Sequence, residues 1–202
     1  MKNKIRFIIT AVMTALMLSA CVPAGEVASF TEDELMSGIH HAEIKVKDVG
    51  TIYVELDADT APITVTNFCN LANEGFYDGL TFHRIIEGFM IQGGDPEGSG
   101  YGGSDQMIKG EFSENGVDND ISHVRGVISM ARRSSGYDTG SSQFFIMHAD
   151  YTSLDGQYAA FGHVTDGMDV VDYLAENTPV EDSNGTVLAE NQPVIESIVI
   201  TD

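Results

Sequence analysis

The chain has 202 residues, of which 43% are hydrophobic and 20% charged, as is ordinary for a soluble globular domain with an appendage. Its 21 glycines follow no strict period, which excludes a collagen-like chain, and two cysteines are too few for a disulfide scaffold. With 31 acidic against 10 basic residues, the net charge of -21 argues against nucleic-acid binding, because phosphate contacts need Lys and Arg.

The first twenty residues have the pattern of a processing segment. A basic start is followed by an apolar run from Phe7 to Ala20, which is too short for a transmembrane helix of about 20 apolar residues. We therefore expect a secretory signal peptide. The run ends in Leu18-Ser-Ala-Cys21, which resembles the bacterial lipobox, and the resemblance implies cleavage before Cys21 and lipidation of that cysteine. A plain signal peptide with an incidental cysteine is the alternative.

These features predict a lipoprotein signal peptide at residues 1–20, a tether at 21–38 and a folded domain at 39–202. A lipid on Cys21 would anchor the domain to a membrane of the cell envelope, on its extracytoplasmic side. Cleavage would remove three basic residues and leave 7 basic against 31 acidic ones, a net charge of -24.

Two local patterns open the body of the chain. Residues 31–34 match a capping box and predict a short helix that reaches Met36. Apolar residues then alternate over residues 43–49 and again over 51–56, with Gly50 between the two runs. This alternation predicts a β-hairpin.

Two helices and several short strands are predicted beyond the hairpin. Helical spacing of apolar residues indicates helices at 62–75 and 168–175, and Cys69 reads as a buried structural cysteine on the first. The strand candidates are Thr81–Ile86, Phe89–Gln92, Gly126–Ala131, Gln143–Met147, Ala159–Val164 and Val194–Thr201. Residues 178–193 are polar and predict a loop. Many short strands with two helices predict a mainly β fold, an antiparallel barrel or sandwich.

Two motifs resemble binding sites of other kinds, but the residues around them do not support those functions. Residues 98–103 match G-x-G-x-x-G, but no good helix start follows, so we interpret them as a flexible surface loop. His40 and His41 would point to opposite faces of a strand, and no companion has ligand spacing, so no metal site is predicted. No cofactor is expected.

Two segments carry a more informative pattern: residues 82–95, and residues 126–132 followed by 141–146. On a strand, Met90 and Gln92 share one face, and so do Gln143 and Phe145. Each pair joins an amide to a large apolar side chain, whereas a fully buried or fully solvated face would be uniform. The mixture favours a surface pocket that grips an apolar group and orients a carbonyl or an amide.

Arg84 belongs to the same pattern. Strict alternation places Arg84 on the same face as Phe82 and Ile86, so that its guanidinium lies among apolar neighbours. The same alternation points His83 away from Arg84, and we interpret His83 as a structural residue. A surface ion pair for Arg84 and edge hydrogen bonds for the amides remain an equally good reading of the pattern alone.

Both segments resemble the cyclophilin family of peptidyl-prolyl isomerases, and the resemblance runs from about His41 to the end of the chain. It implies an eight-stranded antiparallel barrel capped by two α-helices. It also implies isomerisation of X-Pro bonds without a cofactor or a covalent intermediate.

The resemblance assigns residues one at a time. Arg84 matches the catalytic arginine, and Gln92, which matches a polar group flanking the pocket, is assigned to catalysis with it. The substrate-binding positions are Phe89, Met90, Ala131, Arg132, Gln143, Phe145, Leu154 and Tyr158. Arg132 stands where the family often has asparagine, Tyr158 where histidine is frequent, and Ser153 where tryptophan is frequent. The loss of that tryptophan puts tight binding of cyclosporin in doubt.

A chemical reason supports the arginine. Rotation about an X-Pro bond crosses a barrier of about 20 kcal/mol because it breaks amide resonance. Arg84 could donate a hydrogen bond to the prolyl nitrogen, whose lone pair is localised only in the twisted state.

We expect a monomer that acts on proline-containing peptides and unfolded exported proteins. The alternative is a membrane-tethered module that binds proline segments without catalysis.

Overall fold

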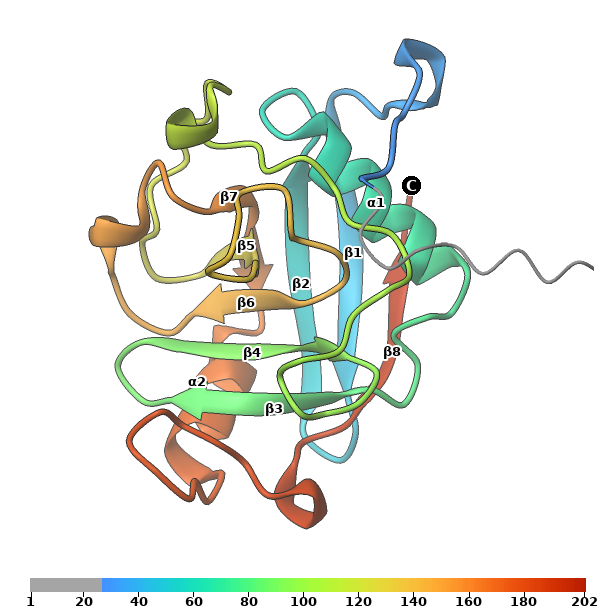
Figure 1. The fold of residues 1–202 in the computed structure, drawn as a ribbon. Coiled ribbons are helices and arrows are strands. Elements are labelled where there is room, and N and C mark those ends of the chain that lie inside the picture. The colour runs from blue at the N-terminus through green and yellow to red at the C-terminus, as the bar shows by residue number, and fades with distance from the viewer. Residues whose placement is uncertain (1–26) are drawn as a thin grey trace, which may run out of the picture.

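The computed structural model describes residues 27–202, so the predicted signal peptide and Cys21 lie outside the described residues (Figure 1). This part of the chain forms eight strands and two α-helices, with four 3-10 helices of three residues each. The strands are β1 (Ile39–Val46), β2 (Gly50–Asp57), β3 (Thr81–Ile86), β4 (Met90–Asp95), β5 (Val127–Met130), β6 (Phe144–Met147), β7 (Ala159–Asp166) and β8 (Ile195–Ile200). The helices are α1 (Pro62–Asn73) and α2 (Met168–Asn177).

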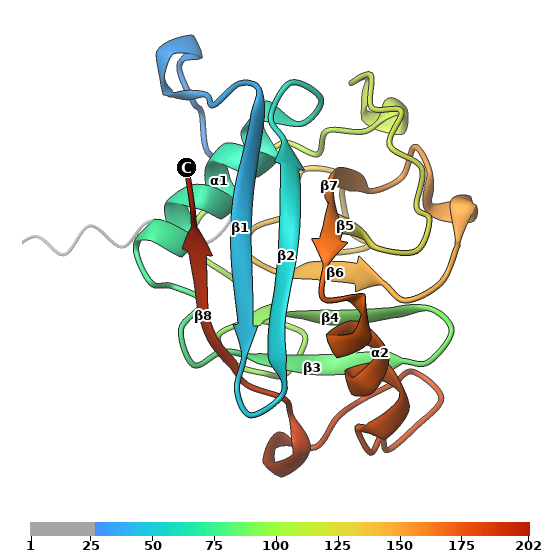
Figure 2. The same ribbon diagram turned by 180° about the vertical axis from the view of Figure 1, so that it is seen from behind.

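All eight strands belong to one antiparallel sheet in the order β3-β4-β6-β5-β7-β2-β1-β8. The sheet curls into a half-barrel whose edge strands approach each other where Thr81 bridges Val194. Helices α1 and α2 lie at opposite ends of it, and Figure 2 shows β8, β1 and β2 side by side between them. The predicted mainly β fold, with eight antiparallel strands and two helices, is confirmed.

The β1–β2 hairpin forms as its alternation predicts. Ile44 pairs with Ile52, and both side chains are fully buried, while Lys45 and Tyr53 point outward. The turn contains Asp48 at φ 61°, a left-handed conformation that aspartate tolerates better than most residues. The hairpin thereby contributes one apolar face to the barrel core.

Helix α1 begins at Pro62, whose missing N–H costs nothing in a first turn. Ala61 precedes it and has no side chain to cap the helix. The buried carboxylate of Glu111 supplies the cap instead, accepting the N–H groups of Ile63 at 2.9 Å and Thr64 at 2.7 Å. The helix is therefore fixed to the loop before β5.

The core is centred on aromatic rings. Phe144 of β6 meets the rings of Phe68, Tyr77 and Phe82 edge to face, with centroids 5.6, 5.7 and 6.1 Å away. Cys69 of α1 is fully buried beside them, and desolvation raises the pKa of its thiol to about 12, as fits the predicted structural cysteine.

Residues 27–38 lie against the domain. Val27 bridges Met107, Phe30 packs on the core, and the Met36 N–H donates to the Thr66 hydroxyl at 2.8 Å. The capping-box contact is present, since the Thr31 N–H donates to the Glu34 carboxylate at 2.7 Å. The predicted helix as far as Met36 is wrong in extent: only Glu32–Glu34 are helical, because the backbone becomes extended at Leu35.

Candidate active site

Three neighbouring strands place three predicted site residues in one row. Arg84 of β3 pairs with Gln92 of β4, and Gln92 pairs with Phe145 of β6. Alternation on β6 sends Phe144 into the barrel core and Phe145 to the opposite face. The row therefore lies on the outer surface of the sheet.

An open pocket of about 240 Å³ lies over this row. It is lined by Arg84, Phe89, Met90, Gln92, Ala131, Arg132, Phe145, Leu154 and Tyr158. Met90 and Phe145 are buried and centre a small apolar cluster that is separate from the barrel core. Nine of the ten predicted site residues thus meet in one concave site.

Arg84 lies at the edge of this apolar cup. Its Nη1 donates to Gln92 Oε1 at 3.2 Å and lies 3.8 Å from Met90 Sδ, while Cζ is 5.9 Å from the Phe89 ring centroid. Partial burial lowers the pKa of the guanidinium, which nonetheless stays protonated near neutral pH. Among the described residues, Arg84 forms no ion pair. The reading of Arg84 as a surface ion-pair residue therefore does not hold within residues 27–202.

The neighbours of Arg84 differ from the predicted ones. Strict alternation places Phe82 on the same face, but Phe82 is fully buried in the barrel core. The cause is a β-bulge, since the register of β3 against β4 shifts between Phe82 and Arg84. Ile86 does share the pocket side with Arg84.

A chain of amide hydrogen bonds extends from Arg84 along the site. Gln92 Nε2 donates to Gln143 Oε1 at 2.8 Å, and Gln143 Nε2 donates to the Gly102 carbonyl at 2.8 Å. Because Gly102 offers an acceptor, the orientation of both amides follows from the pattern of donors. The Gln92 oxygen therefore points toward the arginine.

Gln143 lines a second cleft of about 500 Å³ that shares Gln92, Ala131 and Arg132 with the pocket. One of its walls is the glycine-rich loop of residues 98–103, which the sequence suggests is merely a flexible surface loop. The Asp95 carboxylate organises this loop by accepting the N–H groups of Glu97, Ser99, Gly100 and Gly102. Although burial opposes it, these hydrogen bonds lower the pKa of Asp95.

Two residues that depart from the family pattern pack together. The Arg132 guanidinium lies 4.8 Å from the Tyr158 ring centroid, and its Nε donates to the Gln157 carbonyl at 2.9 Å. The Tyr158 ring in turn meets Phe145 edge to face at 5.8 Å. Both departures therefore belong to the pocket wall.

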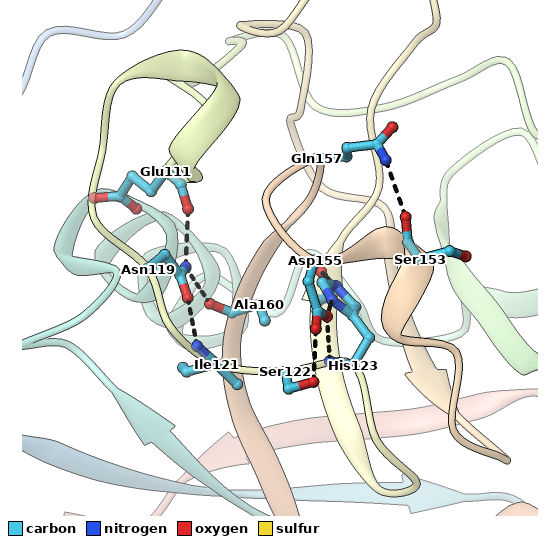
Figure 3. Close-up of polar contacts among 10 residues, drawn as sticks. Glu111, Asn119, Ile121, Ser122, His123, Ser153, Asp155, Gln157 and Ala160 are labelled. Atoms are coloured by element: carbon cyan, nitrogen blue, oxygen red, sulfur yellow. Dashed lines mark hydrogen bonds and ion pairs between the residues drawn. The ribbon is translucent and has the colours of Figure 1, made fainter.

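Behind the pocket wall lies the buried His123, and Figure 3 shows its contact with Asp155. His123 Nδ1 lies 2.9 Å from Asp155 Oδ1, Nε2 lies 3.0 Å from Ser129 Oγ, and the ring stacks on Phe145 with centroids 6.0 Å apart. Asp155 directly follows Leu154, so the same contact fixes that side of the pocket.

His83 is the other buried histidine near the site. It lies beside Gly100, and neither ring nitrogen has a hydrogen-bond partner among the described residues. Desolvation lowers its pKa, so the ring is neutral near pH 7. This position fits the structural role predicted for it.

Sequence reasoning missed one residue that contacts Arg84. The polar stretch 178–193, predicted only as a loop, brings Asn184 against the guanidinium. The loop prediction is correct, but no periodicity signals such a contact across 100 residues.

Within residues 27–202, no group of three or more His, Cys, Asp or Glu is placed to hold a metal ion. No helix of this part is long and apolar enough to cross a membrane.

Comparison with known proteins identifies the family. The model of the family described as cyclophilin type peptidyl-prolyl cis-trans isomerase/CLD matches residues 41–202. Peptidyl-prolyl cis-trans isomerase B of Bacillus subtilis is 47% identical over 145 residues, which cover 72% of this chain and 92% of that protein. A peptidyl-prolyl cis-trans isomerase of Helicobacter pylori is 43% identical over 152 residues, covering 74% of this chain and 89% of that protein.

Solved structures agree. The crystal structure of a cyclophilin type peptidyl-prolyl cis-trans isomerase of Cryptosporidium parvum matches with a TM-score of 0.72 at 30% identity, covering 82% of this chain and 99% of that one. The chain therefore belongs to the cyclophilin-type peptidyl-prolyl cis-trans isomerases.

Proposed function

We propose that this enzyme isomerises X-Pro bonds by donating a hydrogen bond from Arg84 to the prolyl nitrogen of the twisted amide. One observation carries the proposal: Arg84 is half-buried at the rim of an apolar cup and forms no ion pair among the described residues. A guanidinium held in this way keeps its charge and has donors to spare for a substrate.

The chemistry needs nothing else that titrates. When the amide twists, its resonance is lost and the nitrogen lone pair becomes a hydrogen-bond acceptor, which it is not in either planar form. A donor aimed at that nitrogen stabilises the transition state over both ground states. Phe145, Met90 and Leu154 form the cup that would hold the proline ring while the bond turns.

The substrate class follows from the cup and the amides beside it. A proline ring is apolar, and the carbonyl before it needs a polar partner, which Gln92 can supply. A Cryptosporidium parvum relative, 32% identical with a TM-score of 0.70, has a crystal structure determined in the presence of the dipeptide Ala-Pro. This relative supports proline-containing peptides as the ligands of the pocket.

For the setting of this activity, we propose the extracytoplasmic face of a membrane, with a lipid on Cys21 as the anchor. Residues 27–38 pack on the domain, so only residues 22–26 can act as a spacer. Fully extended, these residues reach at most about 18 Å. The enzyme would then work close to the membrane surface, on exported proteins that are still unfolded.

The test is the isomerisation rate of a short X-Pro peptide, measured with residues 22–202 and with the same protein carrying Arg84→Ala. We expect kcat/KM to fall about 100-fold or more, because the hydrogen bond exists only in the transition state. Lys45→Ala is the matched control, since it removes one positive charge from an exposed ion pair with Glu196. A rate that Arg84→Ala leaves unchanged contradicts the mechanism.

The same assay separates the second candidate, a module that binds proline segments without catalysis. The departures at Arg132, Ser153 and Tyr158 favour it, since Arg132 and Tyr158 line the pocket and Ser153 directly precedes Leu154 of its wall. Peptide binding without any rate enhancement would support that candidate.

A further inference from the structure

The loop of residues 181–187 lies against the catalytic strand β3. Arg84 forms an isolated bridge with Thr186, and the Ile85 N–H donates to the Gly185 carbonyl at 2.8 Å. On the far side of that bridge, the Val187 N–H donates to the His83 carbonyl at 3.0 Å. The loop thus holds the backbone of β3 directly at Arg84.

Asn184 of this loop contacts the guanidinium twice. Arg84 Nε donates to the Asn184 carbonyl at 2.8 Å, and Arg84 Nη2 donates to Asn184 Oδ1 at 3.3 Å. Gln92 accepts from Nη1 on the other side. A guanidinium has five N–H bonds, so these three contacts leave one donor on each terminal nitrogen, and the one on Nη1 meets only the weak acceptor Met90 Sδ, at 3.8 Å.

The shape of the loop is specified by two features. The Asp182 carboxylate accepts the N–H of Asn184 at 2.9 Å, and the N–H and hydroxyl of Thr186 at 3.1 and 3.0 Å. Gly185 has φ 78°, and a Cβ there would collide with the Ile85 carbonyl oxygen. Only glycine therefore allows the loop to approach β3 this closely.

We propose that Asn184 is a positioning residue, which orients the Arg84 guanidinium so that its two remaining donors face the prolyl bond. The proposal rests on the catalytic role proposed for Arg84. A neutral amide suits this task, because it accepts hydrogen bonds from the guanidinium and leaves the positive charge in place. A carboxylate at the same position would neutralise that charge.

The positioning role predicts a specific kinetic effect. In the full chain held in detergent, Asn184→Ala should lower kcat by about threefold to tenfold and leave KM within about twofold, because orientation matters most in the transition state. The carbonyl contact to Nε survives the substitution, which limits the loss. Ser183→Ala is the matched control: it lies in the same loop, is exposed, and has no side-chain hydrogen bond among the described residues.

A double-mutant cycle distinguishes positioning from a general effect on the fold. Lysine has no planar guanidinium to orient, so in an Arg84→Lys background Asn184→Ala should lower kcat by less than about twofold. An equal loss in both backgrounds, or a loss no larger than that of Ser183→Ala, overturns the proposal. If Arg84→Lys itself leaves kcat unchanged, the proposed mechanism fails instead, and the two failures are distinguishable.

The Nε–H proton of Arg84 gives a readout that does not depend on activity. Asp182→Ala removes three hydrogen bonds that shape the loop and should release the Asn184 carbonyl from Nε. We expect the Arg84 Nε–H signal in NMR spectra to exchange with water at least about tenfold faster than in the unmodified chain. Unchanged exchange in Asp182→Ala also overturns the proposal.

Discussion

At the residue scale, Arg132 shows how the pocket wall accommodates a side chain that differs from the asparagine often found in the family. Its guanidinium stacks on Tyr158 and also lies 5.4 and 5.1 Å from the ring centroids of Phe112 and Tyr137. Cation–π contacts of this kind contribute about 0.5–2 kcal/mol each. Arg132 therefore stiffens the wall made by Tyr158, although it carries no carboxylate partner among the described residues.

Removing Arg132 should weaken substrate binding more than catalysis. In Arg132→Ala the Tyr158 ring loses its cover, so we expect KM for an X-Pro peptide to rise about threefold to tenfold while kcat stays within about twofold. Lys47→Ala is the control, because Lys47 is exposed, lies on neither cleft, and has no side-chain hydrogen bond or ion pair among the described residues. A fall in kcat with KM unchanged would place Arg132 in the chemical step and contradict this role.

At the element scale, Glu111 couples a loop to helix α1. Its carboxylate accepts two backbone N–H groups of the first turn and the Thr64 hydroxyl at 2.6 Å. All three donors would lose their partner in Glu111→Ala, and Thr64 is fully buried. A buried donor without a partner costs about 1–3 kcal/mol.

Glu111→Ala should therefore lower the free energy of unfolding by about 2–4 kcal/mol, as measured by urea denaturation. Glu111→Gln keeps one accepting oxygen and should lose about half as much. The exposed Glu114→Ala, in the 3-10 helix of the same loop, is the control for removing a charge. Equal stability of Glu111→Ala and Glu114→Ala would show that the cap does not stabilise α1.

The elements themselves could be predicted well because each has a local cause. Alternation located the β1–β2 hairpin, and Pro62 with helical spacing located α1. Strand ends moved by a few residues: β4 runs from Met90 to Asp95, whereas Phe89–Gln92 was expected, because backbone pairing with β3 continues through the glycines. Helix α2 ends at Asn177, two residues beyond the predicted Ala175.

The parts of the site that escaped prediction have non-local causes. The bulge between Phe82 and Arg84 arises from pairing between strands, which periodicity within one strand cannot show. The contact from Asn184 arises where a loop returns to β3, and the loop of residues 98–103 becomes a wall only because Asp95 gathers its N–H groups. The resemblance to the family placed the pocket residues, whereas the residues' own pattern left the role of Arg84 open.

At the scale of the whole molecule, two buried histidines set the pH response. Burial lowers the pKa of His83 and of His123 below the ordinary value of about 6.5. Both rings therefore take up a proton less readily than a free imidazole does, and Arg84 remains charged. We expect kcat/KM to change less than about tenfold between pH 6 and 8, as measured with an X-Pro peptide. A larger change would contradict a mechanism in which nothing titrates.

Stability should respond to pH where activity does not. Below about pH 6.5 both histidines become protonated in the unfolded chain, whereas burial disfavours their protonation in the folded protein. The free energy of unfolding therefore falls as the pH drops toward the lowered pKa values. Urea denaturation at pH 7.5 and pH 5 measures this loss. It should be smaller in His123→Gln, because that variant cannot take up the proton. Glu111, whose pKa burial raises, acts in the opposite direction, so the comparison between variants is the decisive one.

The anchor proposed at Cys21 concerns the molecule as a whole. All pocket residues lie within residues 27–202, and the domain would connect to the lipid only through residues 22–26. Each buried CH₂ of an acyl chain contributes about 0.8 kcal/mol, so several chains hold a protein to a membrane stably. The remaining chain, at -24, would be repelled by anionic lipid headgroups.

Cys21→Ser should therefore move the protein from the membrane fraction to the soluble fraction of the cell envelope, while kcat/KM stays within about twofold. Cys69→Ser is the matched control, since it removes the buried thiol of α1 and should leave the protein in the membrane fraction. Retention of Cys21→Ser in the membrane fraction would mean that the signal segment itself, uncleaved, holds the chain there. Its apolar run is shorter than a stable membrane span requires, so we expect release.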